Sequence, residues 1–220
     1  MSSLNRRRFV KSTAAAGVAP LIIGTKSSAK VKGANDRLRI AVAGLNGRGG
    51  SHLGGFGVIK GVEIAYVADP DSRARDRRLN EVRSRGHKNC KAVVDIREAL
   101  EDPEVDAISV ATPNHWHSLM TIWAAQAGKH VYVEKPMSHD VEEGRVAVAA
   151  QKKYGVVIQH GTQRRSSAEI AGLHEMIKAG TWGKLKIAYG YCCKPRGGIG
   201  TKGASSPPEN LDWGIWKGPA

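Results

Sequence analysis

Short apolar runs alternate with longer amphipathic stretches from residue 37 to about residue 160. The apolar runs have the length of β-strands and fall at 38–43, 64–68, 92–94, 107–111, 131–134 and 156–158. Between these runs apolar side chains recur every three or four positions, as at Leu119, Ile122 and Trp123, which is the period of a helix. Strands that are apolar on both faces and alternate with helices are typical of a parallel sheet covered by helices on each side. We therefore expect an α/β fold with a doubly wound parallel sheet over residues 36–160.

Polar residues mark the ends of several predicted helices. Asp140 and Glu143 have the spacing of a capping box, so a helix should begin near residue 141. Asp71 is well placed to cap the helix that follows the second strand. Residues 167–179 have a helical pattern, and Gly180 is expected to end that helix.

A glycine-rich turn, Gly44-Leu45-Asn46-Gly47-Arg48-Gly49, follows the first predicted strand. Gly44 and Gly49 hold the first and third positions of the G-x-G-x-x-G pattern, while Asn46 replaces the middle glycine. Asparagine tolerates left-handed backbone angles better than most residues, so we expect the turn to survive. The backbone around Gly47 and Arg48, at a helix N-terminus, would then bind a pyrophosphate. This turn alone is also compatible with a simple tight turn; together with the strand pattern it predicts a Rossmann domain.

Asp69 closes the second strand about 25 residues after Gly44, where an acidic side chain binds the ribose of an adenosine. A carboxylate there repels a 2′-phosphate, so it favours NAD over NADP. Arg73 and Arg75 lie nearby and could reverse that preference, which leaves NADP open.

Two motifs follow the fourth and fifth predicted strands. The first reads Thr112-Pro113-Asn114-His115-Trp116-His117, and the second reads Glu134-Lys135-Pro136. Ligands of doubly wound folds bind at the carboxyl ends of parallel strands, where both motifs fall. In order and separation they resemble the T-P-N-x-x-H and E-K-P motifs of the Gfo/Idh/MocA family of oxidoreductases, and the resemblance extends over residues 37–165.

The resemblance implies a nicotinamide cofactor and a sugar or polyol substrate. Thr112, Pro113 and Asn114 would form the wall beside the nicotinamide half of the cofactor. His117 would pack or hydrogen-bond in the same place.

The second motif would supply the catalytic group. Glu134 would contact the nicotinamide ribose, and Lys135 would lie between cofactor and substrate and act on the substrate hydroxyl. The Lys135–Pro136 bond is often cis in the family. Gln163 and Arg164 match a family segment that faces the substrate, although a basic helix start would also explain them.

Residues 161–220 would begin the C-terminal substrate and oligomerisation domain of such a protein. Residues 185–191 have the pattern of its first strand, and a loop rich in proline and glycine follows. One strand cannot form a sheet, so we interpret this domain as truncated α+β structure in which Trp213 and Trp216 have little to pack on. A homo-oligomer would form through the missing sheet.

Two other functions remain open at this stage. Some relatives cleave glycosides by transient oxidation with tightly held NAD, but Lys135 counts against that activity here. A noncatalytic cofactor-binding protein is the other alternative. His115 and His117 could share a metal ion, but no third ligand follows from the spacing, so we expect no metal.

The N-terminus predicts export. Residues 6–11 read Arg-Arg-Arg-Phe-Val-Lys, small and apolar residues follow to about residue 25, and residues 27–29 are Ser-Ser-Ala. This arrangement is typical of a signal peptide at 1–29 and resembles a twin-arginine signal, which predicts transport by the twin-arginine machinery to the periplasm. The formal net charge of +14 favours anionic partners. No basic stripe with interleaved aromatic residues is present, so nucleic acid is not an expected partner.

Overall fold

A computed structural model describes residues 37–191, 195, 197, 198 and 200–219. The predicted signal peptide lies outside the described residues. No helix within the described ranges is long and apolar enough to cross a membrane.

Six parallel strands form one sheet, in the order β3-β2-β1-β4-β5-β6. The strands are β1 (Leu38–Ala43), β2 (Val62–Ala68), β3 (Lys91–Val93), β4 (Ala107–Val110), β5 (His130–Glu134) and β6 (Ile158–Gly161). The order reverses between β1 and β4, which is the arrangement of a Rossmann fold. The predicted doubly wound α/β domain is therefore confirmed.

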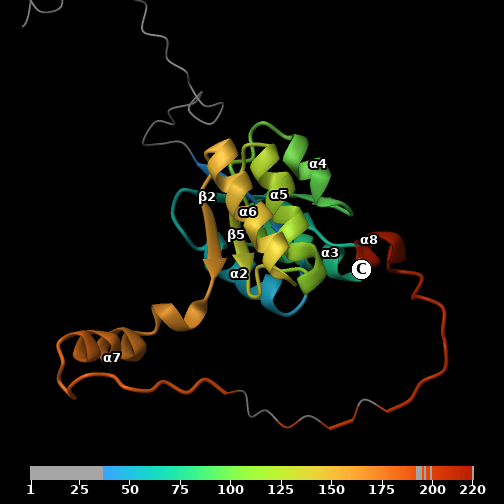
Figure 1. Cartoon of the computed structure of the whole chain (residues 1–220). Helices are drawn as coiled ribbons and strands as arrows, with labels where there is room; N and C mark the ends of the chain where they lie inside the picture. The colour runs from blue at the N-terminus through green and yellow to red at the C-terminus, as the bar shows by residue number, and fades with distance from the viewer. Residues whose placement is uncertain (1–36, 192–194, 196, 199, 220) are drawn as a thin grey trace, which may run out of the picture.

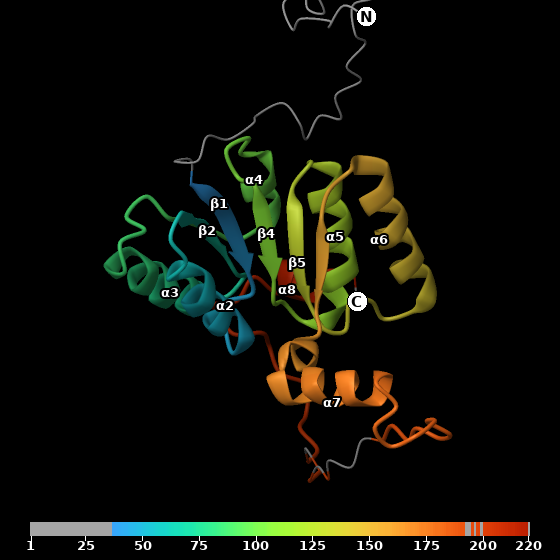
Figure 2. The ribbon, with the colours of Figure 1, turned by 90° about the vertical axis from the view of Figure 1, so that its left-hand side faces the viewer.

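Helices cover both faces of the sheet. They are α2 (Arg48–Gly57), α3 (Ser72–Ser84), α4 (Ile96–Glu101), α5 (His117–Gln126) and α6 (Val141–Tyr154). Helices α2 and α3 pack on one face, whereas α4 and α5 pack on the other, with α6 beside α5. All the strands point towards one edge of the sheet, and the later part of the chain lies beyond that edge (Figure 2).

The alternating side chains of the strands form two cores. Ile40, Val42 and Ile64 are buried against α2 and α3. Ala41 and Ala43, the neighbours of Val42 along β1, are buried on the opposite face. Because both faces of each central strand are covered, these strands read as continuous apolar runs in the sequence.

Most of the predicted helix ends are found. Asp71 accepts hydrogen bonds from the backbone of Arg73 and Ala74 and caps α3. Asp140 caps α6 by accepting from the backbone of Glu143 at 2.8 Å. The other half of the expected capping box differs, since Glu143 accepts from His139, one residue before the cap.

The last strand begins later than predicted. Residues 156–158 were expected to be extended, but β6 starts at Ile158 and runs to Gly161. Val156 is instead buried in the turn from α6, where it contacts Ala125 and Ala150. The pairing of Glu134 with Gly161 places the end of β6 beside the end of β5.

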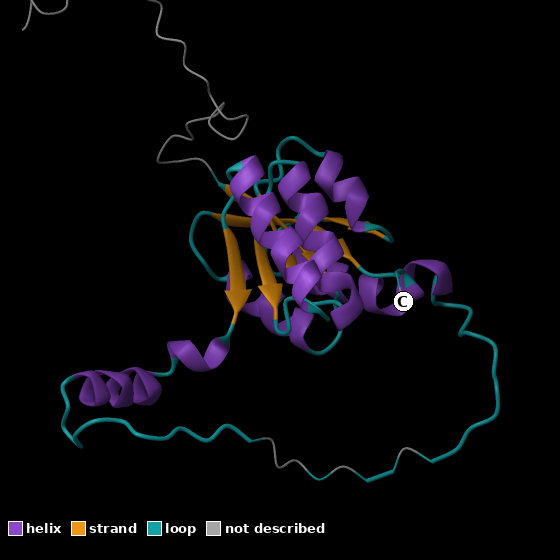
Figure 3. Ribbon diagram, in the orientation of Figure 1, coloured by secondary structure: helices purple, strands orange, loops and turns teal. Residues whose placement is uncertain are grey.

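The chain then leaves the sheet through the 3₁₀ helix η3 (Gln163–Ser166) and helix α7 (Ala168–Lys178), which lies apart from the Rossmann domain (Figure 1). Gly180 has a positive φ of 71° just past α7, as predicted. The strand predicted at residues 185–191 is not formed (Figure 3). A strand needs a neighbour to accept its backbone hydrogen bonds, and no described segment pairs with this one.

Residues 209–219, which we call the return segment, come back to the Rossmann domain and include helix α8 (Trp213–Lys217). Asp71 and Leu211 form an antiparallel bridge. The expectation that Trp213 and Trp216 have little to pack on was wrong. It assumed that these residues belong to a separate domain, whereas helix α8, which carries them, lies against the Rossmann domain (Figure 1), and the carbonyl of Trp216 accepts a hydrogen bond from the indole of Trp116 at 3.3 Å.

Candidate functional site

The glycine-rich turn brings β1 and α2 against the end of β4. Gly44 has a φ of 81°, and a β-carbon there would lie 2.5 Å from the carbonyl oxygen of Ala111. A β-carbon at Gly49 would collide with the carbonyl of Gly44 itself. Glycine is therefore required at the first and third positions of the motif, because any larger residue would force the strand and the helix apart.

Asn46 does not use the left-handed backbone that the sequence suggested. Among the described residues, only glycines have a positive φ, and within this turn they are Gly44 and Gly47. The side chain of Asn46 instead accepts a hydrogen bond from Arg77 at 2.6 Å. The tight turn is thus made possible by Gly47, the residue that follows Asn46.

The N-terminus of α2 fits an anionic group. No side chain caps this helix at Gly47, whereas aspartates cap α3, α4 and α6. Nothing lies within 4 Å of the position that a β-carbon at Gly47 would occupy. Uncapped amides at a helix N-terminus, next to open space, are what a pyrophosphate needs.

Asp69 is buried at the end of β2 and faces this turn. Its carboxylate accepts hydrogen bonds from the backbone of Leu45 at 2.7 Å and of Asp71 at 2.9 Å. Burial raises the pKa of Asp69, although these two amides act in the opposite direction. Each carboxylate oxygen has a second lone pair, so Asp69 can still accept from a ribose hydroxyl. Arg75 donates to the backbone carbonyl of Asp69 at 2.6 Å.

Glu134, the last residue of β5, is the centre of a polar network. Its carboxylate accepts from Arg48 at 2.9 Å, from His52 at 2.9 Å and from the amide of Gln163 at 2.6 and 2.7 Å. Burial alone would raise its pKa, but the hydrogen bonds from these three side chains outweigh burial and lower the pKa of Glu134 to about 2. The carboxylate is therefore ionised at neutral pH.

His52, a buried residue of α2, contacts this carboxylate and was not predicted from the sequence. Its other ring nitrogen lies 2.7 Å from the hydroxyl of Ser109 on β4. Burial lowers the pKa of His52. A neutral ring that donates to Glu134 and accepts from Ser109 satisfies both contacts. The only signal in the sequence is that His52 follows Arg48 by four residues and so shares its helix face.

His117 joins the two sequence motifs. Its ring nitrogens lie 2.9 Å from the carbonyl oxygen of Thr112 and 2.5 Å from that of Pro136. The predicted contact with a cofactor stays a prediction, since both nitrogens already face the protein backbone. The hydroxyl of Thr112, in contrast, is buried without a hydrogen-bond partner, so a bound polar group would satisfy it.

A cleft of about 450 Å³ collects most of the predicted side chains at the carboxyl ends of β4 and β5. Its lining residues are Arg48, Ala111, Thr112, Asn114, His117, Glu134, Lys135 and Gln163. Lys135 is exposed, and the Lys135–Pro136 peptide is cis, as the resemblance implied. Pro113 and Arg164 are exposed and do not line this cleft, so their roles stay predictions.

The two histidines of the first motif are not arranged as metal ligands. His115 lies 3.0 Å from the carbonyl oxygen of Trp216, and His117 bonds the carbonyls described above. Within the described ranges, no group of three or more His, Cys, Asp or Glu side chains could hold a metal ion.

A family model described as "Oxidoreductase family, NAD-binding Rossmann fold", GFO_IDH_MocA, matches residues 38–162. The chain is 35% identical over 154 residues to the inositol 2-dehydrogenase of Mycolicibacterium smegmatis, covering 69% of this chain and 43% of that relative. It is also 35% identical over 149 residues to the scyllo-inositol 2-dehydrogenase (NAD(+)) of Bacillus subtilis, covering 67% and 42%.

The myo-inositol 2-dehydrogenase from Lactobacillus plantarum has a similar structure, with a TM-score of 0.62 and 26% identity. That match covers 68% of this chain and 43% of the other. The chain therefore spans less than half the length of the relatives that it matches.

Proposed function

Because the chain belongs to the Gfo/Idh/MocA family of NAD-binding oxidoreductases, we propose that it is the cofactor-binding part of a dehydrogenase. The reaction is exchange of a hydride between NAD and a hydroxyl-bearing carbon of a sugar or polyol. The observation that carries this proposal is that Lys135, Glu134 and Thr112 line one cleft beside the glycine-rich turn.

The cofactor-binding residues follow from the geometry of the site. The uncapped start of α2 would hold the pyrophosphate, and Asp69 would accept from the adenosine ribose. The hydroxyl of Thr112 and the carboxylate of Glu134 would contact the nicotinamide half. NAD, when bound, supplies the redox chemistry by taking up or returning the hydride. A buried carboxylate at Asp69 favours NAD over NADP because it repels a 2′-phosphate.

Lys135 has the catalytic role. Its side chain, which is exposed, would in the neutral amine form accept the proton of the reacting hydroxyl as the hydride leaves the carbon for NAD. In the reverse direction the resulting ammonium would polarise the ketone and return that proton. Glu134 cannot share that role at neutral pH, because three side chains already donate to its carboxylate. Its function is to fix the strand end that carries Lys135. Gln163, which also donates to Glu134, fixes the start of η3 beside the end of β5.

Cyclic polyols are the first substrates to test, because several relatives are named inositol 2-dehydrogenases. The full-length protein is incubated with inositols and free sugars, with NAD and separately with NADP, and reduced cofactor is followed by absorbance. Lys135→Ala should lower kcat at least about 100-fold and leave NAD affinity unchanged. Lys60→Ala, an exposed lysine in the turn before β2, is the matched control.

Three outcomes would contradict the proposal. Retained turnover in Lys135→Ala would reject the catalytic role of this lysine. Release of the alcohol from aryl glycosides without net reduction of NAD would indicate a redox-dependent glycosidase. NAD binding with no turnover of any polyol or sugar would favour a noncatalytic protein.

We also propose that the protein is exported by the twin-arginine machinery and assembles as a homo-oligomer. The support is the sequence pattern of residues 6–11 and, for assembly, the apolar residues that α7 exposes. Replacement of Arg6 and Arg7 by lysine should keep the protein in the cytoplasm, as cell fractionation would detect. Light scattering of the exported protein measures its oligomeric state, and a monomer would contradict the assembly.

A further inference from the structure

The return segment, residues 209–219, lies outside the range that the family model matches. It packs on the carboxyl edge of the sheet, the edge that carries the cleft described above (Figure 2). The return segment is therefore close enough to the cleft to contribute residues to the site, although it is distant from the motifs in the sequence.

One end of the return segment is held at the end of β2. The backbone of Asp212 donates to the carbonyl of Pro70 at 3.1 Å, and the backbone of Ser72 donates to the carbonyl of Asn210 at 2.9 Å. The side chain of Asn210 donates to the carboxylate of Asp71 at 2.8 Å. These contacts fix the segment beside the residues that directly follow Asp69.

The other end is held by the first sequence motif. The indole nitrogen of Trp116 donates to the carbonyl of Ile215 at 3.0 Å and to that of Trp216 at 3.3 Å. A β-carbon at Gly218 would collide with the indole of Trp116, so glycine permits this close approach. The segment therefore spans the gap between the ends of β2 and β4.

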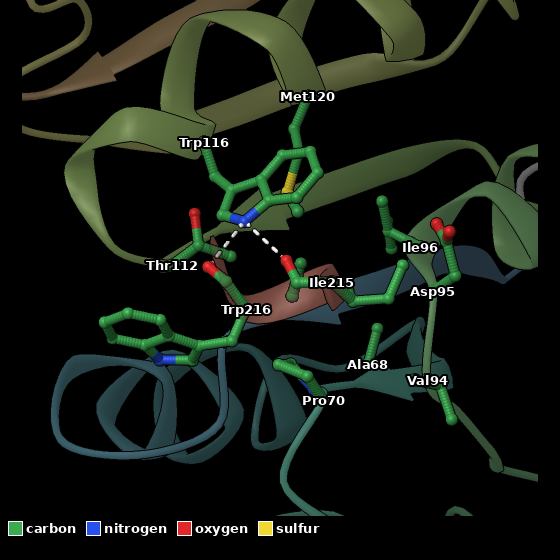
Figure 4. Close-up of a pocket in the computed structure, with 12 residues that line it drawn as sticks. Ala68, Pro70, Val94, Asp95, Ile96, Thr112, Trp116, Met120, Ile215 and Trp216 are labelled. Carbon is green, nitrogen blue, oxygen red and sulfur yellow. Dashed lines mark hydrogen bonds between the residues drawn. The ribbon is translucent and has the colours of Figure 1, made fainter. Parts of the chain in front are cut away.

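Its position matches the adenosine half of a dinucleotide. Asp69, at the end of β2, marks the ribose of the adenosine, while Lys135, at the end of β5, marks the nicotinamide. The sheet order places β2 and β5 on opposite sides of β1 and β4. The return segment lies between the ends of β2 and β4 and away from β5, and Val94 and Asp95, the residues after β3, complete its surroundings (Figure 4).

Ile215 anchors the segment. Its side chain points towards Ile96 and Ala68 (Figure 4), and the cavity that remains there is only about 30 Å³. A space of that size holds about one or two water molecules but no purine base. The apolar ends of the strands are thus nearly filled by Ile215, and a base has to bind on the outer side of the segment.

Trp216 offers a surface for such a base. Its indole points away from the cavity (Figure 4) and keeps 37% of its surface exposed. Trp213 stacks on it with ring centroids 4.9 Å apart and an interplanar angle of 12°. His115 contacts the same indole edge-on at 6.0 Å. The ring of Trp216 therefore has two aromatic neighbours and is partly open to solvent.

We propose that the return segment is the adenosine-side wall of the dinucleotide site, and that the adenine ring stacks on the indole of Trp216. The proposal rests on the proposed function, since it assigns a further binding residue to the same NAD site. An aromatic platform suits adenine because stacking between a base and an indole needs only two flat, apolar faces in register.

The test is calorimetric titration of the full-length protein with NAD, with ADP as the probe of the adenosine half and with nicotinamide mononucleotide as the probe of the other half. Trp216→Ala should weaken binding of NAD and ADP about tenfold and leave the mononucleotide unaffected. Gly218→Ala, which displaces the segment from Trp116 without altering Trp216, should act in the same direction. Trp182→Ala, which removes an indole that is 60% exposed in another part of the chain, is the matched control.

The possible results separate the two proposals. Unchanged or tighter ADP binding in Trp216→Ala and Gly218→Ala overturns the wall and leaves the dehydrogenase intact. A wild-type protein that binds neither NAD nor ADP overturns the proposed function itself. If Trp216→Ala does not fold, Trp216→Leu keeps an apolar side chain without a ring: a tenfold loss of ADP affinity then supports stacking, and wild-type affinity refutes it.

Discussion

Replacement of Glu134 by glutamine tests whether the polar network at the end of β5 stabilises the fold through an ionised carboxylate. The substitution keeps the shape of the side chain and an acceptor oxygen for His52, but it removes the charge that Arg48 and Gln163 bind. Glu134 is 5% exposed, so water compensates little for that loss.

The magnitude follows from the pKa of Glu134, which lies at about 2 against an ordinary value of 4.5. Each pKa unit corresponds to about 1.4 kcal/mol, so the network favours the ionised folded state by roughly 3 kcal/mol. Arg48 is half exposed and regains water in the variant, which lowers the expected loss of unfolding free energy to about 2 kcal/mol at pH 7.

The pH dependence has a definite sign. The folded-state pKa of Glu134 is depressed, so its contribution is complete above the unfolded pKa near 4.5 and is lost as the pH falls towards 2. Urea unfolding of wild type and Glu134→Gln should therefore differ most at pH 7, and by less than half as much at pH 3. Titrating groups outside the network are common to both proteins, so the difference isolates Glu134 together with its coupling to His52.

Glu142→Gln is the matched control, because this exposed glutamate of α6 forms an exposed ion pair with Arg145, at 3.5 Å. Its effect at pH 7 should stay within about 0.5 kcal/mol. A Glu134→Gln deficit that is equally large at pH 7 and pH 3 would refute the reasoning, since it would reflect altered packing of the side chain and not its charge.

Two further predictions concern the same part of the fold. Gly49→Ala should lower the free energy of unfolding by more than about 3 kcal/mol, because its β-carbon would collide with the carbonyl of Gly44. Gly55→Ala is the control on the same helix: its β-carbon meets nothing within 4 Å, so Tm should be unchanged or slightly raised. Equal Tm values for the two variants in thermal unfolding would contradict the packing argument. Wild-type stability should decline between pH 7 and pH 5, because the lowered pKa of His52 means that the unfolded chain binds the proton more readily than the folded chain. His52→Gln should make this decline smaller. If urea titrations show that the variant and the wild type lose stability in parallel over this range, His52 is not the group responsible.

The sequence was sufficient for the fold of the Rossmann domain because the signals involved are local. Apolar runs of strand length and a glycine turn predict a parallel sheet without any knowledge of its partners. The two motifs could be placed together in advance because parallel strands end at one edge, which is where Thr112 and Lys135 line the same cleft. Gln163 was placed there by resemblance, and its hydrogen bonds to Glu134 agree with that placement.

Contacts between distant side chains could not be predicted in the same way. The pairing of His52 with Glu134 joins residues 82 positions apart, and no periodic pattern encodes such a pair. The return segment was misjudged for a similar reason. Trp213 and Trp216 look unpartnered in a linear sequence because the groups that hold their segment are brought to it only by the completed sheet. These groups are the carbonyl of Pro70, which accepts from Asp212, and the indole of Trp116, which donates to the carbonyl of Trp216.

The network around Glu134 connects the two halves of the site. Two of its three donors lie where an element of the fold begins: Arg48 begins α2, and Gln163 begins η3 just after β6. The glycine-rich turn, the strand end that carries Lys135 and the exit from the sheet are thus fixed by one carboxylate. Because the hydrogen bonds share a single buried charge, loss of any one donor weakens the position of the other elements. It follows that substitutions at Arg48 or Gln163, though these residues belong to different elements, should impair NAD binding and the placement of Lys135 together and not separately.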